Sequence, residues 1–129
     1  MNLTLRALPG RYAVARLPFD AAVPQWALAR GAVVSITRSD RELSIVCADD
    51  AVPADVTAER DFVGWRVEGT LDFALTGILA RLTQPLADAQ ISLFALSTFE
   101  TDYLWVRAKN AAAAIAAWRS AAVFVDELQ

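Results

Sequence analysis

The chain of 129 residues contains no histidine and a single cysteine, Cys47. The lack of histidine removes the commonest general base and a common metal ligand. It also excludes a Ser-His-Asp or Cys-His nucleophile, and a zinc site is not expected either. With one cysteine the chain cannot form an internal disulfide. We therefore expect no catalytic residues, no metal and no cofactor, and we expect that the protein is not an enzyme.

Clustered basic residues and long apolar runs are also missing. The net charge is −3 and no basic stretch stands out, which argues against nucleic-acid binding. The longest apolar run, residues 111–118, is far short of the roughly 20 residues that a membrane-spanning helix needs. The first ten residues do not resemble a signal peptide, and a lone cysteine suits a reducing compartment. We expect a cytoplasmic protein that does not bind membranes.

The residues that are present predict many short strands. Runs that alternate between apolar and polar residues, or that are rich in β-branched side chains, are typical of strands. Two more runs, residues 3–8 and 122–126, are candidate strands, and residues 3–8 would form an edge strand. The expected strands cover residues 11–17, 32–38, 43–48, 65–70, 91–98 and 103–108, with 3–8 and 122–126 as the candidates.

Helical signals lie between these runs. Residues 75–89 place apolar side chains at helical spacing, with Pro85 inside the stripe, so we expect a kink or a break there. Asn110 can cap a second helix over residues 111–121. A short helix that begins with a proline is expected over residues 24–30.

The second half of the chain has the order strand, helix, strand, strand, helix, strand, and the first half looks like a shortened copy of it. A shift of 60 positions aligns "TRSDRE" with "STFETD", and it places Glu42 on Asp102. The polar, turn-rich residues 49–63 are expected to link the two halves. We therefore expect an α+β protein with an internal repeat.

The segment 72–98, "DFALTGILARLTQPLADAQISLFALST", resembles the ACT domain, although Thr76 stands where the family usually has proline before Gly77. Four blocks, "LPFD", "SITRSDRELSIVC", "LDFALTGILA" and "ALSTFETDYLWV", resemble small bacterial tandem-ACT proteins related to the cytosolic arginine sensor of the TOR kinase pathway.

This resemblance implies two ACT-like (ferredoxin-like βαββαβ) halves with antiparallel sheets covered by helices on one face. Residues 1–60 would be a shortened N-terminal half and residues 61–129 a C-terminal ACT domain. The family pairs its units side by side, with an amino acid between them. The resemblance therefore implies a homodimer with a regulatory role that binds a small molecule, an amino acid.

The start of the 75–89 helix is one candidate wall of a ligand site. If Thr76 caps this helix, the free backbone N–H groups of Gly77 and Ile78 suit a carboxylate. In the alternative, Asp72 is the cap and Gly77 lies inside the helix. The resemblance favours Thr76. Leu75 stands where the arginine sensor has an acidic residue, so we expect a smaller or less basic amino acid than arginine.

The polar residues between the two strands of 91–106 are the other candidate wall. Asp102 could pair with an ammonium group, Thr98 offers a hydroxyl, and Phe99 could cover an aliphatic stem. Asp, Ser and Thr are also ordinary turn residues, so a simple hairpin turn is the competing interpretation. By resemblance, Ser92 and Leu93 of a neighbouring unit would close the pocket.

The same two strands are apolar on both faces. Tyr103 and Trp105 lie on one face and Leu104 and Val106 on the other, and helices can cover only one of them. The first half or a partner chain must cover the second face. An assembly module without a ligand is therefore the alternative function. Core packing is the expected role of three tryptophans and the cysteine: Trp26, Trp65, Trp118 and Cys47.

Overall fold

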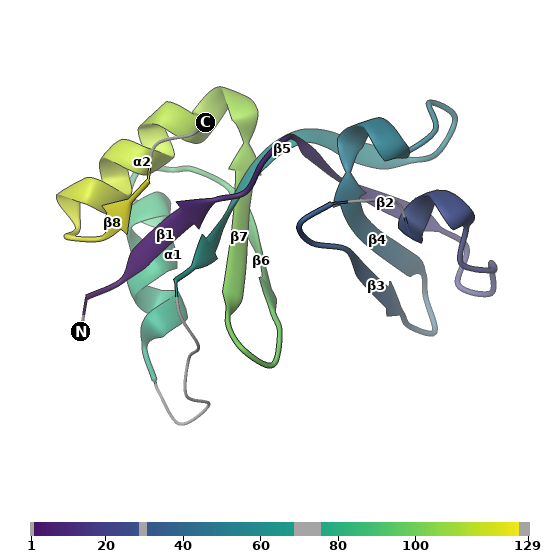
Figure 1. The fold of residues 1–129 in the computed structure, drawn as a ribbon, viewed down its shortest axis with the longest axis horizontal. Coiled ribbons are helices and arrows are strands. Elements are labelled where there is room, and N and C mark those ends of the chain that lie inside the picture. The colour runs from purple at the N-terminus through teal and green to yellow at the C-terminus, as the bar shows by residue number, and fades with distance from the viewer. Residues whose placement is uncertain (1, 29–30, 69–75, 127–129) are drawn as a thin grey trace. The chain divides into compact units, whose positions relative to one another are not determined.

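The computed structural model describes residues 2–28, 31–68 and 76–126. The chain divides into two compact units (Figure 1): an N-terminal unit, Gly10–Phe62, and a C-terminal unit, Met1–Pro9 with Val63–Gln129. These units differ from the expected halves, 1–60 and 61–129, because residues 2–9, which include the first strand, pack with the C-terminal unit.

The N-terminal unit is a four-stranded antiparallel sheet in the order β3-β4-β2-β5. Along the chain its elements alternate as strand, turn, strand, strand, turn, strand, with two short 3-10 helices in place of α-helices. This is a reduced βαββαβ unit. Its elements are β2 (Tyr12–Leu17), η1 (Gln25–Leu28), β3 (Ser35–Arg38), β4 (Leu43–Ala48), η2 (Asp49–Ala51) and the first part of β5 (Ala58–Val67).

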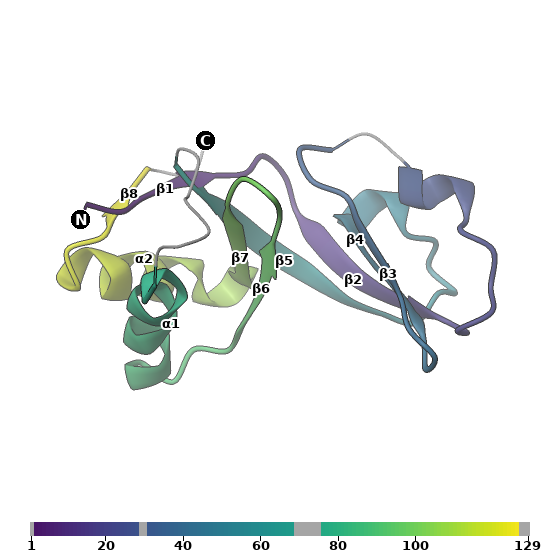
Figure 2. The same ribbon diagram turned by 90° about the horizontal axis from the view of Figure 1, so that it is seen from below.

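The C-terminal unit is a full βαββαβ arrangement with one added strand. Its sheet runs in the order β6-β7-β5-β1-β8. Figures 1 and 2 show both helices on the same face of this sheet. Its elements are β1 (Thr4–Ala7), the rest of β5, α1 (Ile78–Asp88), β6 (Leu93–Ser97), β7 (Asp102–Arg107), η3 (Ala108–Asn110), α2 (Ala111–Ser120) and β8 (Phe124–Val125).

The strand β1 is not the edge strand that the sequence suggested. It pairs antiparallel with β5 and parallel with β8, so it lies inside the sheet. The N–H groups of Phe124 and Asp126 donate to the carbonyls of Leu3 and Leu5, and these bonds place β8 outside β1. The expectation was wrong because the sequence does not show which strands pair, and the candidate strand at 122–126, which contains β8, pairs with the outer side of β1.

Tryptophans dominate the core of the C-terminal unit. Trp65 on β5 meets Trp118 on α2 edge to face, with ring centroids 4.9 Å apart. Nε1 of Trp118 donates a hydrogen bond of 2.8 Å to the carbonyl of Leu82 on α1, which ties the two helices together. Both tryptophans are fully buried, as expected. Trp26 is only partly buried and packs against the core of the N-terminal unit.

Cys47 is buried in the core of the N-terminal unit, as expected of a small apolar side chain. Burial, followed by the nearby Asp49 carboxylate, raises the pKa of its thiol. Nearby, the expected linker is in fact structured. Residues Asp49–Ala51 form η2 and β5 begins at Ala58. The linker prediction was wrong because polar composition does not reveal the side-chain bonds that hold this segment in place.

Two helix predictions also need correction. Of the kink or break expected at Pro85, the break does not occur, because α1 continues to Asp88. Leu82 and Leu86 are fully buried on either side of Pro85, and this packing stabilises the helix across the missing hydrogen bond. Asn110 makes no side-chain capping bond, because it ends η3, which leads directly into α2.

The two hairpins of the expected repeat correspond at an offset of 59 positions rather than 60. Arg38 and Leu43 face each other at the end of one hairpin, and Ser97 and Asp102 do so at the end of the other, 59 positions later. Asp102 therefore corresponds to Leu43, and Glu42 corresponds to Thr101. The two polar segments resemble each other under either shift, so the sequence could not fix the register.

Candidate functional site

The helix α1 begins after Gly77, which has a left-handed backbone with φ of 79°. The N–H of Arg81 donates to the carbonyl of Gly77 over 3.0 Å and closes the first turn. The preceding amides, from Ile78 onward, therefore lack an acceptor within the helix. The left-handed conformation explains why glycine stands here. Among the residues that the structure describes, no atom lies within 4 Å of a Cβ built at position 77.

This geometry decides between the two expected helix starts. The N-terminal cap is Gly77 itself, and no side chain caps the helix, so Thr76 does not act as the cap. Asp72 does not start the helix either, since α1 begins at Ile78. Asp72 and Leu75 lie outside the described residues. Thr76 and Gly77 are exposed, whereas Ile78 is buried.

The polar segment at the tip of the β6–β7 hairpin is a closed loop. The N–H of Thr98 donates to the carbonyl of Thr101 over 2.9 Å. The hydroxyl of Ser97 donates to Oδ1 of Asp102 over 2.6 Å, directly across the two strands. The half-buried Asp102 can still accept a bond from a cation through its second oxygen. Phe99, at the tip, is 82% exposed.

The equivalent loop of the N-terminal unit closes in the same way. The N–H of Ser39 donates to the carbonyl of Glu42 over 2.9 Å, and the N–H of Glu42 donates to the Ser39 hydroxyl over 3.2 Å. Turn chemistry therefore accounts for Thr98, as the competing interpretation held. It does not account for the exposed Phe99 or for the carboxylate of Asp102, which replaces Leu43.

The structure brings some of the expected site residues together and leaves others apart. Thr98, Phe99 and Asp102 share one hairpin, and Figure 1 shows this hairpin and the start of α1 at the same end of the C-terminal unit. Ser92 and Leu93 lie at the beginning of β6, at the opposite end of that strand from the loop. Within one chain, these two residues do not join the others.

Two residues that matter at this hairpin were not singled out in the sequence. Thr101 is buried, and its hydroxyl donates to the carbonyl of Val67 on β5 over 2.9 Å. Gly64 on β5 makes room for the indole of Trp105. Thr101 lies inside the polar segment, which was the available signal. The place of Gly64 beside Trp105 depends on strand pairing, and no sequence pattern shows that.

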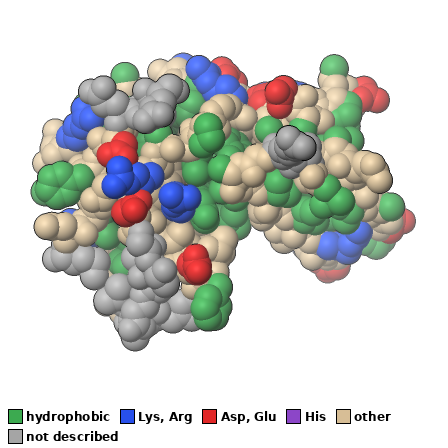
Figure 3. Space-filling model, in the orientation of Figure 1, with side chains coloured by type: hydrophobic (Ala, Val, Ile, Leu, Met, Phe, Trp, Pro, Cys, Tyr) green, Lys and Arg blue, Asp and Glu red, His purple; other side chains and the backbone are tan. Residues whose placement is uncertain are grey.

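A charged cluster covers β1 on the face of the C-terminal sheet opposite the two helices. Figure 3 shows basic and acidic side chains gathered there. Nε of Arg6 lies 2.9 Å from Glu68, and its Nη1 bonds Asp126. The hydrogen bond to Asp126, followed by that to Glu68, raises the pKa of Arg6. All three side chains are exposed, so these ion pairs contribute little stability. No group of three potential metal-ligating side chains occurs among the described residues.

Comparisons with known proteins identify the fold. A family model of the ACT domain matches residues 57–120, and a model of an N-terminal domain matches residues 10–55. The crystal structure of protein Atu0741 from Agrobacterium tumefaciens is 36% identical over 100% of this chain and 95% of that chain, with a TM-score of 0.92. The chain belongs to the same family as Atu0741 and contains an ACT domain. Comparison with curated proteins finds no match.

Solved structures of aspartate kinase and of its regulatory subunit share this fold. The regulatory subunit of aspartate kinase from Thermus flavus matches with a TM-score of 0.59 and 14% identity, over 94% of this chain and 97% of that chain. Aspartate kinase from Clostridium acetobutylicum, described as an allosteric enzyme, matches with a TM-score of 0.62 and 11% identity, over 91% of this chain and 34% of that chain. At these identities the likeness establishes the fold. The ACT match contains the α1 start and the β6–β7 hairpin.

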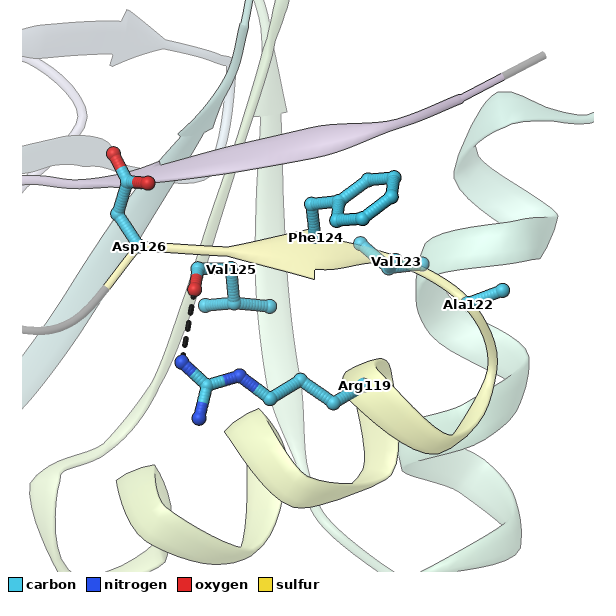
Figure 4. A pocket seen from close by; sticks show the side chains of 6 residues that line it. All are labelled: Arg119, Ala122, Val123, Phe124, Val125 and Asp126. Atoms are coloured by element: carbon cyan, nitrogen blue, oxygen red, sulfur yellow. Dashed lines mark hydrogen bonds between the residues drawn. The ribbon is translucent and has the colours of Figure 1, made fainter.

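An open hollow of about 420 Å³ lies at the C-terminal border of the ACT domain, between the end of α2 and β8. Figure 4 shows the guanidinium of Arg119 reaching the carbonyl of Val125, and Nη2 donates to it over 3.0 Å. None of the expected site residues lines this hollow. Arg119 instead occupies a backbone acceptor on the edge strand β8. Among the described residues, no helix of this ACT protein is long and apolar enough to cross a membrane.

Proposed function

We propose that this protein is a regulatory ACT protein that binds an amino acid at the end of its C-terminal unit. The observation that carries the proposal is the start of α1. It combines amides that lack an acceptor within the helix, a left-handed Gly77, and a position where a Cβ would meet none of the described residues within 4 Å. Backbone N–H groups at a helix start form a ready site for a carboxylate.

The β6–β7 hairpin supplies the second contact surface. Asp102 is half-buried and already oriented by Ser97, so its carboxylate can bind the ammonium group of an amino acid. Phe99 projects from the loop and can cover an aliphatic side chain. A carboxylate site and an ammonium site at the same end of the C-terminal unit would together match the charges of a zwitterion. The regulatory and allosteric aspartate kinases that share the fold support the same role.

The amino acid remains to be identified. The resemblance to the arginine sensor is a prediction, and Leu75 stands where that sensor has an acidic residue. We propose a smaller or less basic amino acid than arginine for this reason. Ser92 and Leu93 lie away from Thr98 and Asp102 in the chain, so they reach such a site only from a second copy of the protein.

The edges of the C-terminal sheet support a homodimer built through β6. Residues 91–99, which include β6, contain no charged residue and no proline. Natural edge strands usually carry such residues to prevent pairing with another chain. The other edge, β8, is two residues long and Arg119 occupies its Val125 carbonyl. The two edges therefore differ, and β6 is the one suited to pairing.

An assembly module without a ligand is the second candidate function. It is favoured by the N-terminal unit, where the same loop closure occurs with Ser39 and Glu42. Part of the hairpin geometry therefore exists without a binding role.

Replacement of Asp102 by Asn separates the two functions. A charge-assisted hydrogen bond contributes about 1.5–3 kcal/mol, so amino-acid affinity should fall at least about tenfold. Glu100→Gln is the matched control, because it removes an exposed carboxylate from the same loop. Titration calorimetry with the amino acids that stabilise the wild type measures both variants. Unchanged affinity together with lower stability in Asp102→Asn would show that Asp102 is only a turn residue.

A further inference from the structure

Among the residues that the structure describes, Thr101 is the one buried polar side chain, with 6% of its surface exposed. Its hydroxyl donates to the carbonyl of Val67 over 2.9 Å. Its own carbonyl accepts the N–H of Thr98 over 2.9 Å and the Thr98 hydroxyl over 3.2 Å. One residue thus closes the hairpin loop and attaches it to β5.

The N-terminal unit provides an internal comparison. Its loop closes through Ser39 and Glu42 with the same backbone bond, but Glu42 stands in the place of Thr101. An ionised carboxylate has no proton to donate to a carbonyl. A threonine is therefore not needed to close such a loop. The bond to the neighbouring strand is an additional feature, made by the residue that stands at this place in the C-terminal unit.

The position of Val67 gives this bond a consequence for the proposed site. Val67 is the last residue of β5, the strand that precedes α1 and its Gly77 cap. The bond therefore fixes the loop to the strand that leads toward the helix start. Phe99 is 82% exposed on this loop, and a contact residue that is held in place before binding loses less entropy when a ligand arrives.

We propose that Thr101 is a positioning residue of the amino-acid site. Its bond to Val67 holds the loop 98–101 so that Phe99 covers the aliphatic part of an amino acid bound at the start of α1. This inference rests on the proposed function, and it adds to that function a residue that touches no ligand itself.

The test compares variants that remove or keep the hydroxyl. Thr101→Val removes it at nearly constant shape, Thr101→Ser keeps it, and Thr101→Ala is a second deletion if the valine variant folds poorly. Thr83→Val is the matched control, because the Thr83 hydroxyl donates a bond of 2.8 Å to the carbonyl of Leu79 within α1. Two readouts are needed: hydrogen exchange of the amides of residues 98 and 101, which both donate within the loop, and titration with whichever of the twenty protein amino acids most stabilises the wild type.

We expect Thr101→Val to raise the hydrogen-exchange rate of the loop about fivefold and to lower the affinity for that amino acid about fivefold. This is the factor that corresponds to the net free energy of one ordinary hydrogen bond. Thr101→Ser and Thr83→Val should stay within about twofold of the wild type in both readouts, well below that factor. A lower melting temperature with unchanged loop exchange and affinity would reduce Thr101 to a structural residue and overturn the inference. If no amino acid stabilises the wild type, the proposed function and the site role of Thr101 both fail. Loop exchange then still reports whether Thr101 holds the loop.

Discussion

At position 64 the absence of a side chain makes room for an indole ring. A Cβ on Gly64 would lie 2.3 Å from Nε1 of Trp105 and 2.5 Å from its Cδ1. Trp105 is fully buried and stacks on Phe94, its partner across the β6–β7 pair, with ring centroids 4.9 Å apart. The ring therefore cannot move aside without disturbing Phe94. Gly64 is needed here because of space, since its backbone is not in the left-handed region.

We predict that Gly64→Ala lowers the free energy of unfolding by about 2 kcal/mol, because overpacking a buried site typically costs about 1–3 kcal/mol. Urea denaturation measures this change. Gly31→Ala is the control, since the nearest atom to its added Cβ is 3.7 Å away. Equal stability of the two variants would mean that Trp105 has room to move.

Single residues were predictable from sequence where their chemistry alone decided their place. Trp65, Trp118 and Cys47 were expected in the core because they are apolar, and they are buried there. Gly64 and Thr101 were not singled out, because their roles depend on which strands are neighbours. Both lie against residues far away in the chain, and a single sequence carries no record of such pairings.

Among the elements, β5 begins with a side-chain clamp. Both terminal nitrogens of Arg60 donate to the turn that contains η2. Nη1 bonds Oδ1 of Asp49 over 3.0 Å, and Nη2 bonds the carbonyls of Val52 and Pro53 over 3.1 and 2.8 Å. Oδ2 of Asp49 also accepts the N–H of Asp61, whose φ is 65°. These bonds hold the turn that was expected to be a linker.

Replacement of Arg60 by Lys should lower the stability of the protein by about 1–3 kcal/mol, because an ammonium group cannot span several acceptors as the planar guanidinium does. Hydrogen exchange of residues 49–53 should also become faster. Arg66→Lys, on the exposed side of the same strand, is the matched control. If both variants exchange like the wild type, then the clamp does not hold the turn.

The elements themselves followed from hydrophobic patterning more closely than their connections did. The strand expected at 43–48 has those limits in the structure, and the helix expected at 111–121 ends one residue earlier. The repeat was found with an offset one residue too large. A shift of one residue reverses the face of every side chain in a strand. Cross-strand pairing, such as Ser97 with Asp102, fixes the register, and it is visible only in the structure.

At the scale of the whole molecule, the proposed pairing of two chains through β6 is the prediction that most affects the proposed site. It would bring Ser92 and Leu93 of one chain toward the site of the other. We predict that the wild type has twice the mass of its 14.0 kDa chain in solution, as measured by light scattering. Ala95→Lys should shift the mass to that of one chain, because it places a charge on the uncharged β6 edge.

Thr37→Lys is the matched control for this variant, because Thr37 is exposed on β3, the edge strand of the N-terminal unit. It should leave the mass unchanged. A wild-type mass near 14 kDa at all concentrations, with or without an amino acid, would contradict the shared-site proposal.

The central claim, that this ACT protein binds an amino acid, is tested most directly by the melting temperature of the wild type with each of the twenty protein amino acids at millimolar concentration. A ligand at 100 times its Kd stabilises the native state by about 2.7 kcal/mol. For a chain of this size, such a gain raises the melting temperature by about 10 °C. We predict a rise of this size for one amino acid or a few related ones, and its loss in Asp102→Asn. No shift with any of the twenty would contradict the claim and favour an assembly module without a ligand.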